Sequence, residues 1–207
     1  MAGKGNYKKN EFHVLSCAII TGLLSELIIA LGMVSSAGIF TAIQAICMLL
    51  SLVVFVVYGV KIIALKEWDR GFWLAGIFHF LRIITFFIFF LLGQVIGQGP
   101  CIVLIGIMPV LSDLCFGIGM ESVAQDESRG LKWVWTLWKF AGVIVGIGVI
   151  YVSCVYGMRI LSERFFEQVL FRHQEDMKFI AYAFLTYWVF RIIQGILTSI
   201  TAKVMEE

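Results

Sequence analysis

Charged residues are scarce in this chain. Of its 207 residues, only 14% are Asp, Glu, Lys or Arg, against about a quarter in soluble proteins. The few charges are clustered, so long uncharged runs lie between them. A formal net charge of +2 gives no indication of an acidic partner such as a nucleic acid. This scarcity of charge argues against a soluble catalytic or nucleic-acid-binding domain.

The signatures of several enzyme classes are also missing. The five cysteines form no C-x-x-C pair and are odd in number, which argues against a disulfide framework or a thiol oxidoreductase. The patterns H-E-x-x-H and G-x-S-x-G, the P-loop and the dinucleotide fingerprint do not occur. A haem between helices needs two histidines at matching depth, and His79 has no such mate. We therefore expect no catalytic residue, no cofactor and no metal site.

Apolar residues dominate instead. They make up 60% of the chain, and the mean hydropathy is +0.95. A helix needs about 20 apolar residues to cross a bilayer, so six helices of about 22 residues would use roughly 130 residues. Only helices and closed barrels span a membrane, and these runs are too long for barrel strands. The sequence predicts an all-α membrane protein with six transmembrane helices.

Turn residues or charges separate the predicted spans. The spans cover about 12–33, 39–65, 72–96, 101–124, 131–158 and 178–202. We expect an N-terminal tail at 1–11, a single transmembrane domain at 12–202 and a C-terminal tail at 203–207. The first apolar run is too long for an ordinary signal peptide, so we interpret it as an uncleaved helix.

An amphipathic segment, 162–177, lies between the last two predicted spans. Its stripe of Phe165, Phe166, Val169 and Leu170 is typical of a helix in the membrane interface. A continuation of the preceding helix beyond the membrane fits equally well, because no helix breaker occurs in this segment.

The positions of lysine and arginine predict the orientation. One side of the predicted topology carries most of them, and the first two loops of the other side carry no charge. Because positive charge is enriched in cytoplasmic loops, both termini are expected in the cytoplasm of a multi-pass cell-membrane protein. The tryptophans at 68, 73, 133 and 135 fall near the same boundary, as in an aromatic belt.

A weak internal repeat suggests three helical hairpins. Gly59 and Gly119 precede similar segments that lead into the third and fifth spans, and Gly195 would start a third copy. Glycine and arginine at the edges of membrane loops are common, so the similarity has that alternative explanation.

Ionisable residues inside the predicted spans are the best functional lead. A rise of 1.5 Å per residue places four of them near the midplane. They are Glu26, Arg82, Asp113 and Arg191, and His79 lies in the same span as Arg82. Each charge costs roughly 2.5–3.5 kcal/mol at a helix centre, so these groups should face one another or a wet cavity.

Two interpretations of these residues stay open. They could line a pathway for a small solute or ion, or they could form buried salt bridges that fix the order of the helices. Pro109, four residues before Asp113, frees a backbone carbonyl nearby and favours the first. Lys139 lies nearer the cytoplasmic face, where it can snorkel, and Glu121 is assigned to a solvated turn.

Glycines at helical spacing allow close packing. Gly142 and Gly146 form one G-x-x-x-G pattern, and Gly93 and Gly97 form another. Packing within the chain is the first interpretation, and a dimer face is the second.

Because of the charges near the midplane, the leading function is a small carrier or channel-like protein. The alternative is a non-transporting subunit that binds a second copy of itself or a membrane partner through glycine-rich faces. We expect contact with the lipid bilayer, and we expect no nucleic-acid partner.

Overall fold

The computed structural model describes residues 10–24, 38–67, 69–161 and 174–205, and these residues are helical almost throughout, with no strand among them. The predicted all-α fold is thereby confirmed for this part of the chain. The chain divides into two compact units, described separately below. Unit 1 combines Met1–Ala64 with Arg191–Glu207, and unit 2 is Leu65–Phe190. Whether they act as a single domain stays a prediction.

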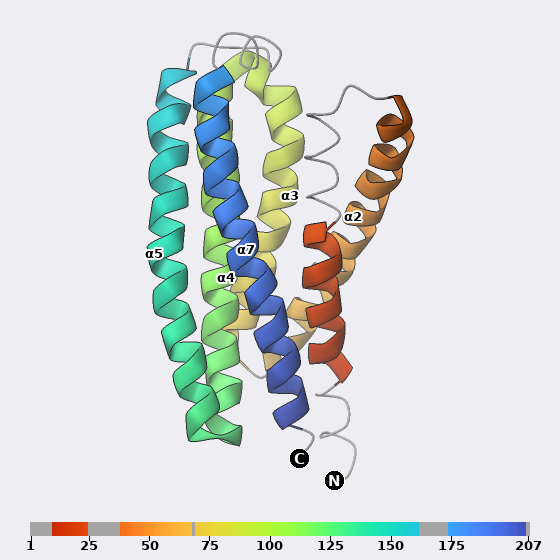
Figure 1. Ribbon diagram of the computed structural model, residues 1–207, viewed down its shortest axis with the longest axis vertical. Helices are drawn as coiled ribbons and strands as arrows, with labels where there is room; N and C mark the ends of the chain where they lie inside the picture. Colours follow the sequence, from red (N-terminus) through yellow and green to blue (C-terminus); the bar gives the residue numbers. More distant parts are fainter. Residues whose placement is uncertain (1–9, 25–37, 68, 162–173, 206–207) are drawn as a thin grey trace. The chain divides into compact units, whose positions relative to one another are not determined.

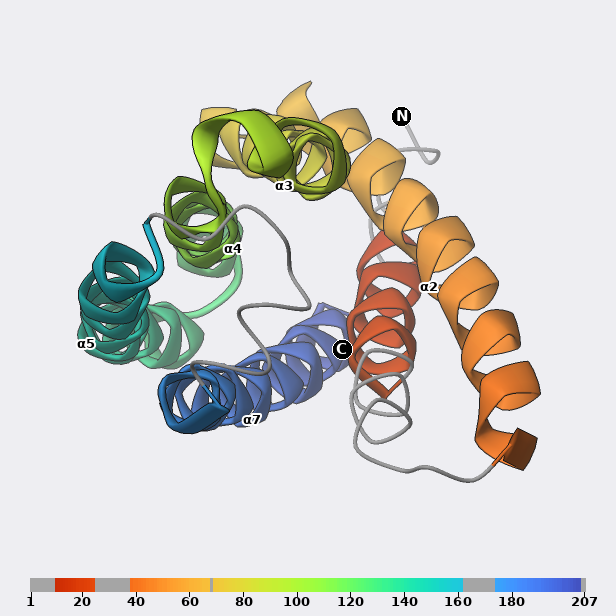
Figure 2. The ribbon, with the colours of Figure 1, turned by 90° about the horizontal axis from the view of Figure 1, so that it is seen from above.

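Unit 2 is built mainly from long helices. The long helices are α3 (Arg70–Ile96), α4 (Gln98–Glu127), α5 (Arg129–Arg159) and α7 (Gln174–Val204), and the short 3-10 helix η1 (Leu65–Glu67) precedes them. Helix α7 belongs to unit 2 only as far as Phe190. Helix α4 packs against both α3 and α5, and Figure 1 shows α4 and α5 side by side. Seen from above, α4 lies between α3 and α5 (Figure 2).

Single residues separate the long helices of unit 2. Gly97 lies between α3 and α4 with a φ of 91°, a conformation that favours glycine because it has no Cβ. Ser128 lies between α4 and α5, and its side chain accepts a hydrogen bond from the Leu131 N–H at 3.1 Å, as a helix N-cap does. The six-residue loop expected at 125–130 is thus a one-residue break.

Glycines allow the three helices to approach closely. A Cβ on Gly99 of α4 would lie 2.2 Å from the Gly157 carbonyl oxygen of α5, and one on Gly146 would lie 2.4 Å from Val110 Cγ1. A Cβ on Gly142 would lie 3.1 Å from the ring of Phe190. Gly142 and Gly146 therefore face the interior of unit 2, as the first interpretation expected. A partner at a glycine-rich face stays a prediction.

Aromatic rings fill the core of unit 2. Trp138 of α5 stacks on Phe190 of α7 with ring centroids 4.0 Å apart. Phe116 of α4 meets both Phe72 and Trp135 edge-on, at 5.8 and 6.2 Å. Trp135 is fully buried. It therefore lies in the core of unit 2 and not in a belt of tryptophans that face the membrane interface.

Unit 1 packs three helical segments together. They are the helix Asn10–Leu24, α2 (Gly38–Ala64) and the end of α7 from Arg191. Ser16 donates a hydrogen bond to the Gly195 carbonyl at 2.7 Å. Lys61 of α2 pairs with Glu11 at 2.7 Å, and Figure 2 shows the N-terminal helix alongside α2. Two charges therefore meet at one end of this unit.

Three of the described helices are long and apolar enough to cross a membrane. They are Leu49–Glu67, Gly99–Glu127 and Arg129–Arg159. On the exposed face of α5, large apolar side chains recur at three- and four-residue spacing: Leu137, Phe140, Ile144, Ile147 and Tyr151. This face suits lipid, since nothing polar interrupts it. The residues of the amphipathic segment at 162–173 and the turn at 34–37 lie outside the described residues.

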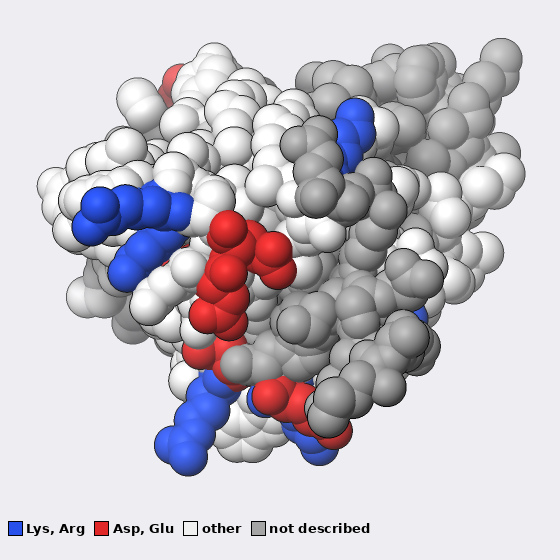
Figure 3. Space-filling view, turned by 90° about the horizontal axis from the view of Figure 1, so that it is seen from below, with Lys and Arg blue, Asp and Glu red and all other residues white. Residues whose placement is uncertain are grey.

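Charge gathers at the helix ends. Figure 3 looks onto the end at which α4 passes into α5 and shows acidic and basic side chains there. Asp126, Glu127 and Arg129 are exposed at that turn. At the opposite end of α5, Arg159 pairs with Asp176 of α7 at 2.9 Å and lies over the Tyr156 ring. A long apolar middle with charged ends is compatible with insertion into a bilayer.

Candidate functional site

Asp113 is a buried acid of unit 2. Only 6% of this residue is exposed. It lies beside an apolar cluster that consists of Val110, Val149, Tyr187 and Phe190. The Tyr187 hydroxyl of α7 donates a hydrogen bond to Asp113 Oδ2. Burying a carboxyl group is costly unless it is paired and hydrogen-bonded. The contact with Tyr187 supplies one such partner from a helix distant in sequence.

A small pocket joins Asp113 to a lysine. It is lined by residues of α4, α5 and α7, among them Asp113, Gly117, Lys139 and Tyr187. Its volume is about 10 Å³, close to the smallest space that holds one water molecule. The pocket therefore has room for about one water molecule.

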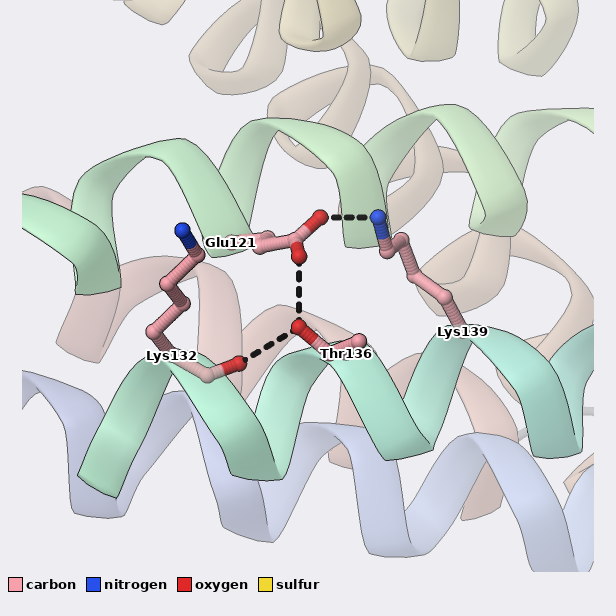
Figure 4. A network of polar contacts seen from close by, with 4 residues as sticks. All are labelled: Glu121, Lys132, Thr136 and Lys139. Carbon is pink, nitrogen blue, oxygen red and sulfur yellow. Dashed lines mark hydrogen bonds and ion pairs between the residues drawn. The ribbon is translucent and has the colours of Figure 1, made fainter. Parts of the chain in front are cut away.

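Lys139 bonds a second acid of α4. Its ammonium group forms an ion pair with Glu121 Oε2, and Thr136 donates to Glu121 Oε1 at 2.5 Å. The Lys132 carbonyl oxygen, 3.0 Å from the Thr136 hydroxyl oxygen, is a second acceptor for the same hydroxyl proton. Figure 4 shows the Glu121 carboxylate between Lys139 and Thr136. The two side chains of the pair are 26% and 19% exposed, so Glu121 is a partner of α5 and no solvated turn residue.

Gly117 makes room for the lysine. A Cβ at this position would lie 3.1 Å from Lys139 Cγ and 3.9 Å from Lys139 Cδ. The lysine stem therefore crosses α4 at Gly117. Since residues four apart share a helix face, Asp113, Gly117 and Glu121 form one stripe along α4. The lysine stem lies over the middle of that stripe, with a carboxyl group on either side.

The other ionisable residues predicted for this unit lie further along α3. Ser112 donates a hydrogen bond to the Ala75 carbonyl of α3 at 2.9 Å, which sets the register of α3 against Asp113. At 1.5 Å per residue, His79 lies about 6 Å and Arg82 about 10 Å beyond Ala75 along the helix axis. His79 is buried and Arg82 is half-buried. Arg82 is thus two turns from the level of Asp113.

The remaining two predicted residues belong to unit 1. Arg191 is 6% exposed and lies on the same face of α7 as the buried Gln194, Thr198 and Thr201. These four residues form a polar stripe in a helix predicted to cross the membrane. Glu26 lies outside the described residues. The structure therefore places Asp113 and Arg191 in buried surroundings, while the prediction that all four charges meet stays untested.

Two features of the site are not predicted by the sequence. Tyrosine is common in membrane helices, so Tyr187 has no feature in the sequence that sets it apart. The pair of Glu121 and Lys139 was missed because both residues were assigned to the membrane surface. One signal was present: Asp113, Gly117 and Glu121 recur at intervals of four, and a small residue between two acids marks the place where a long side chain can cross.

The site offers carboxyl, ammonium and phenol groups but no assembled metal centre. Among the described residues, no group of three or more His, Cys, Asp or Glu side chains could hold a metal ion. The ammonium group of the site belongs to Lys139, which bonds Glu121 and lines the same pocket as Asp113.

Comparison with known proteins adds no family to this description. No family model matches the chain, and no curated protein or solved structure is significantly similar to it.

Proposed function

We propose that this chain is a six-span membrane protein that carries a small solute or ion across the cell membrane, with Asp113 at the centre of its polar site. The burial of Asp113 carries the proposal. A carboxyl group in an apolar helix costs several kcal/mol unless it is paired, and such residues often mark ion pathways. Here the carboxyl group lies among α4, α5 and α7, away from lipid, and lines a pocket.

The surroundings of Asp113 bring polar groups of three helices to one place. The Tyr187 hydroxyl of α7 donates a hydrogen bond to the Asp113 carboxyl group of α4. Lys139 of α5, whose ammonium group bonds Glu121, lines the same pocket. Ionisable groups that gather inside a membrane protein often mark the path of an ion or solute, which supports the proposal.

Ion flux into vesicles tests this function. The full chain would be reconstituted into lipid vesicles that contain dyes sensitive to H⁺, Na⁺, K⁺ or Cl⁻. We expect at least one of these gradients to relax about tenfold faster or more than in protein-free vesicles, a change of about 1.4 kcal/mol in the barrier. If all four gradients persist, the carrier proposal is wrong and the non-transporting subunit becomes the better hypothesis.

The proposed orientation predicts the side from which two positions that flank α5 can be labelled. In a cysteine-free background, a membrane-impermeant thiol reagent should reach Glu127→Cys only from the cytoplasm and Leu161→Cys only from outside. Both positions are exposed, so access depends on sidedness alone. Intact and inverted vesicles would be compared. Labelling of both positions from the same side would contradict a crossing by α5, and the reverse pattern would invert the orientation.

A further inference from the structure

Four side chains from two helices gather at one end of unit 2. On α5, Tyr156 and Arg159 are three residues apart, so they share a helix face, and Asp176 and Phe179 have the same spacing on α7. The rings of Tyr156 and Phe179 stack with centroids 5.4 Å apart and an angle of 6° between their planes. Arg159 Nη1 donates a hydrogen bond to Asp176 Oδ1 at 2.9 Å. We name these four residues the Arg159 cluster; Figure 1 shows the end of α5 and the start of α7 at the same end of the unit.

The Arg159 guanidinium is held in place and still has donors to offer. Its central carbon, Cζ, lies 5.0 Å from the centroid of the Tyr156 ring, as in a cation–π contact. Within the described part of the chain, its hydrogen bond goes to Asp176, which uses one of the five N–H donors of a guanidinium. Since 59% of the Arg159 side chain is exposed, the other donors can reach an acceptor outside the chain.

The Arg159 cluster lies where an apolar helix ends. Arg159 is the last residue of α5, which is long and apolar enough to cross a membrane. Large apolar and aromatic side chains are exposed around the cluster: Tyr151, Met158, Phe179 and Tyr182. Tyrosine is enriched where membrane helices meet the polar head groups. In a bilayer that α5 crosses, the exposed donors of Arg159 therefore lie at the level of the lipid phosphates.

The charges at this end of unit 2 suit a head group that carries both signs. Arg159 supplies one positive charge, whereas Asp176 and the exposed Glu175 supply two negative charges. A lipid with a purely negative head group would therefore meet net repulsion. A phosphate accepts strong hydrogen bonds from a guanidinium. A primary ammonium group donates to carboxylates, each of which has several lone pairs, whereas a choline group has no N–H to donate.

We propose that the Arg159 cluster binds the head group of phosphatidylethanolamine, a zwitterionic phospholipid with a primary ammonium group. The lipid phosphate accepts hydrogen bonds from Arg159, and the ammonium group lies at the carboxylates of Asp176 and Glu175. The acyl chains run along the exposed apolar side chains of α5. This site goes beyond the carrier function and does not depend on it, because it requires only that α5 crosses a bilayer.

Lipid binding to the purified full chain tests the proposal. The chain would be stripped of lipid in mild detergent and titrated with phosphatidylethanolamine, phosphatidylglycerol or phosphatidylcholine, and native mass spectrometry would count the bound lipid. We expect tighter binding of phosphatidylethanolamine than of the other two lipids. Arg159→Gln should weaken this binding about tenfold or more, because hydrogen bonds to a charged group are lost. Arg129→Gln is the matched control: it removes the same charge at the other end of α5, where Arg129 is exposed, and should leave the affinity unchanged.

The other outcomes would overturn the proposal in different ways. Undiminished binding of phosphatidylethanolamine to Arg159→Gln would place the lipid elsewhere. Tighter binding of phosphatidylglycerol would contradict a zwitterionic head group, and equal binding of phosphatidylcholine would contradict a role for the ammonium group. Equal affinity for inorganic phosphate or glycerophosphoethanolamine would indicate a soluble ligand in place of a lipid.

A second variant keeps the test valid if the first does not fold. Elution as a single species in detergent would verify the folding of each variant. Should Arg159→Gln aggregate, Arg159→Lys would replace it, because lysine keeps the positive charge but lacks the planar fork of donors. We expect this variant to bind phosphatidylethanolamine severalfold more weakly than the native chain, and equal affinity would contradict recognition of the phosphate by the guanidinium.

Discussion

Replacing Gly99 by alanine is expected to lower the free energy of unfolding by about 3 kcal/mol, near the upper end of the usual cost of overpacking. The new Cβ would lie 2.2 Å from the Gly157 carbonyl oxygen and 2.9 Å from Leu161 Cα. Both contacts are with backbone atoms, which no side-chain rotation can relieve. The ends of α4 and α5 would have to separate, and the close approach that small residues provide in membrane helices would be lost.

Reversible unfolding in mixed micelles of mild detergent and SDS would measure this loss. Gly148→Ala is the control, because it adds the same methyl group to α5 at a position that faces open space. Equal stability of Gly99→Ala and the native chain would contradict the close crossing of α4 and α5. A loss of equal size in Gly148→Ala would indicate that a partner chain covers the outer face of α5.

Lys139→Met should lower the free energy of unfolding by about 2 kcal/mol, and adding Glu121→Gln should recover most of this loss. Removing one member of a fully buried ion pair costs about 3–5 kcal/mol, whereas exposed pairs contribute about 1 kcal/mol or less. With 26% and 19% of the two side chains exposed, this pair lies between those limits. The single variant leaves Glu121 with Thr136 as its remaining hydrogen-bond partner.

A double-mutant cycle in the same micelles would isolate the coupling between the two side chains. It requires Lys139→Met, Glu121→Gln and the double variant beside the native chain. A double variant about as stable as the native chain is the expected result. Simple addition of the two single losses would show that Lys139 and Glu121 do not interact across the α4–α5 interface.

Helix positions in unit 2 could be predicted from the sequence, because long uncharged runs leave few alternatives. The expected spans 72–96, 101–124 and 131–158 lie within α3, α4 and α5. The breaks were expected to be longer than they are. Charged residues such as Asp126 and Glu127 can continue a helix at its end. Ser128, whose side chain caps the start of α5, marks the break between α4 and α5.

The interior faces were harder to assign. Trp135 was expected at the interface because tryptophan is common there, but it lies on the inward stripe of α5. The buried residues of that stripe recur at helical spacing: Leu131, Trp135, Gly142, Gly146, Val149, Ser153 and Gly157. The small residues in it could have marked the packed face, and they would have placed Trp135 inside.

The candidate site was predicted only in part. The cost of burying charge pointed to Asp113 and Arg191, both of which are buried. The cost of burying charge says nothing about neutral partners, so Tyr187 was not predicted. Depth in the membrane does not determine which residues meet, and the register set by Ser112 and Ala75 places Arg82 two turns from Asp113. Partners in a helical bundle depend on which faces meet, and a single sequence does not specify this.

The carrier proposal is tested most directly by the ion flux of Asp113→Asn, a variant that keeps the size and the polarity of the side chain but takes up no proton and carries no charge. Vesicles with trapped dyes for H⁺, Na⁺, K⁺ and Cl⁻ would compare the native chain, Asp113→Asn and Asp126→Asn, whose acid is exposed at the end of α4. We predict that Asp113→Asn lowers the flux carried by the native chain about tenfold or more, while Asp126→Asn leaves it unchanged. Native flux through Asp113→Asn would contradict a working role for the buried carboxyl group.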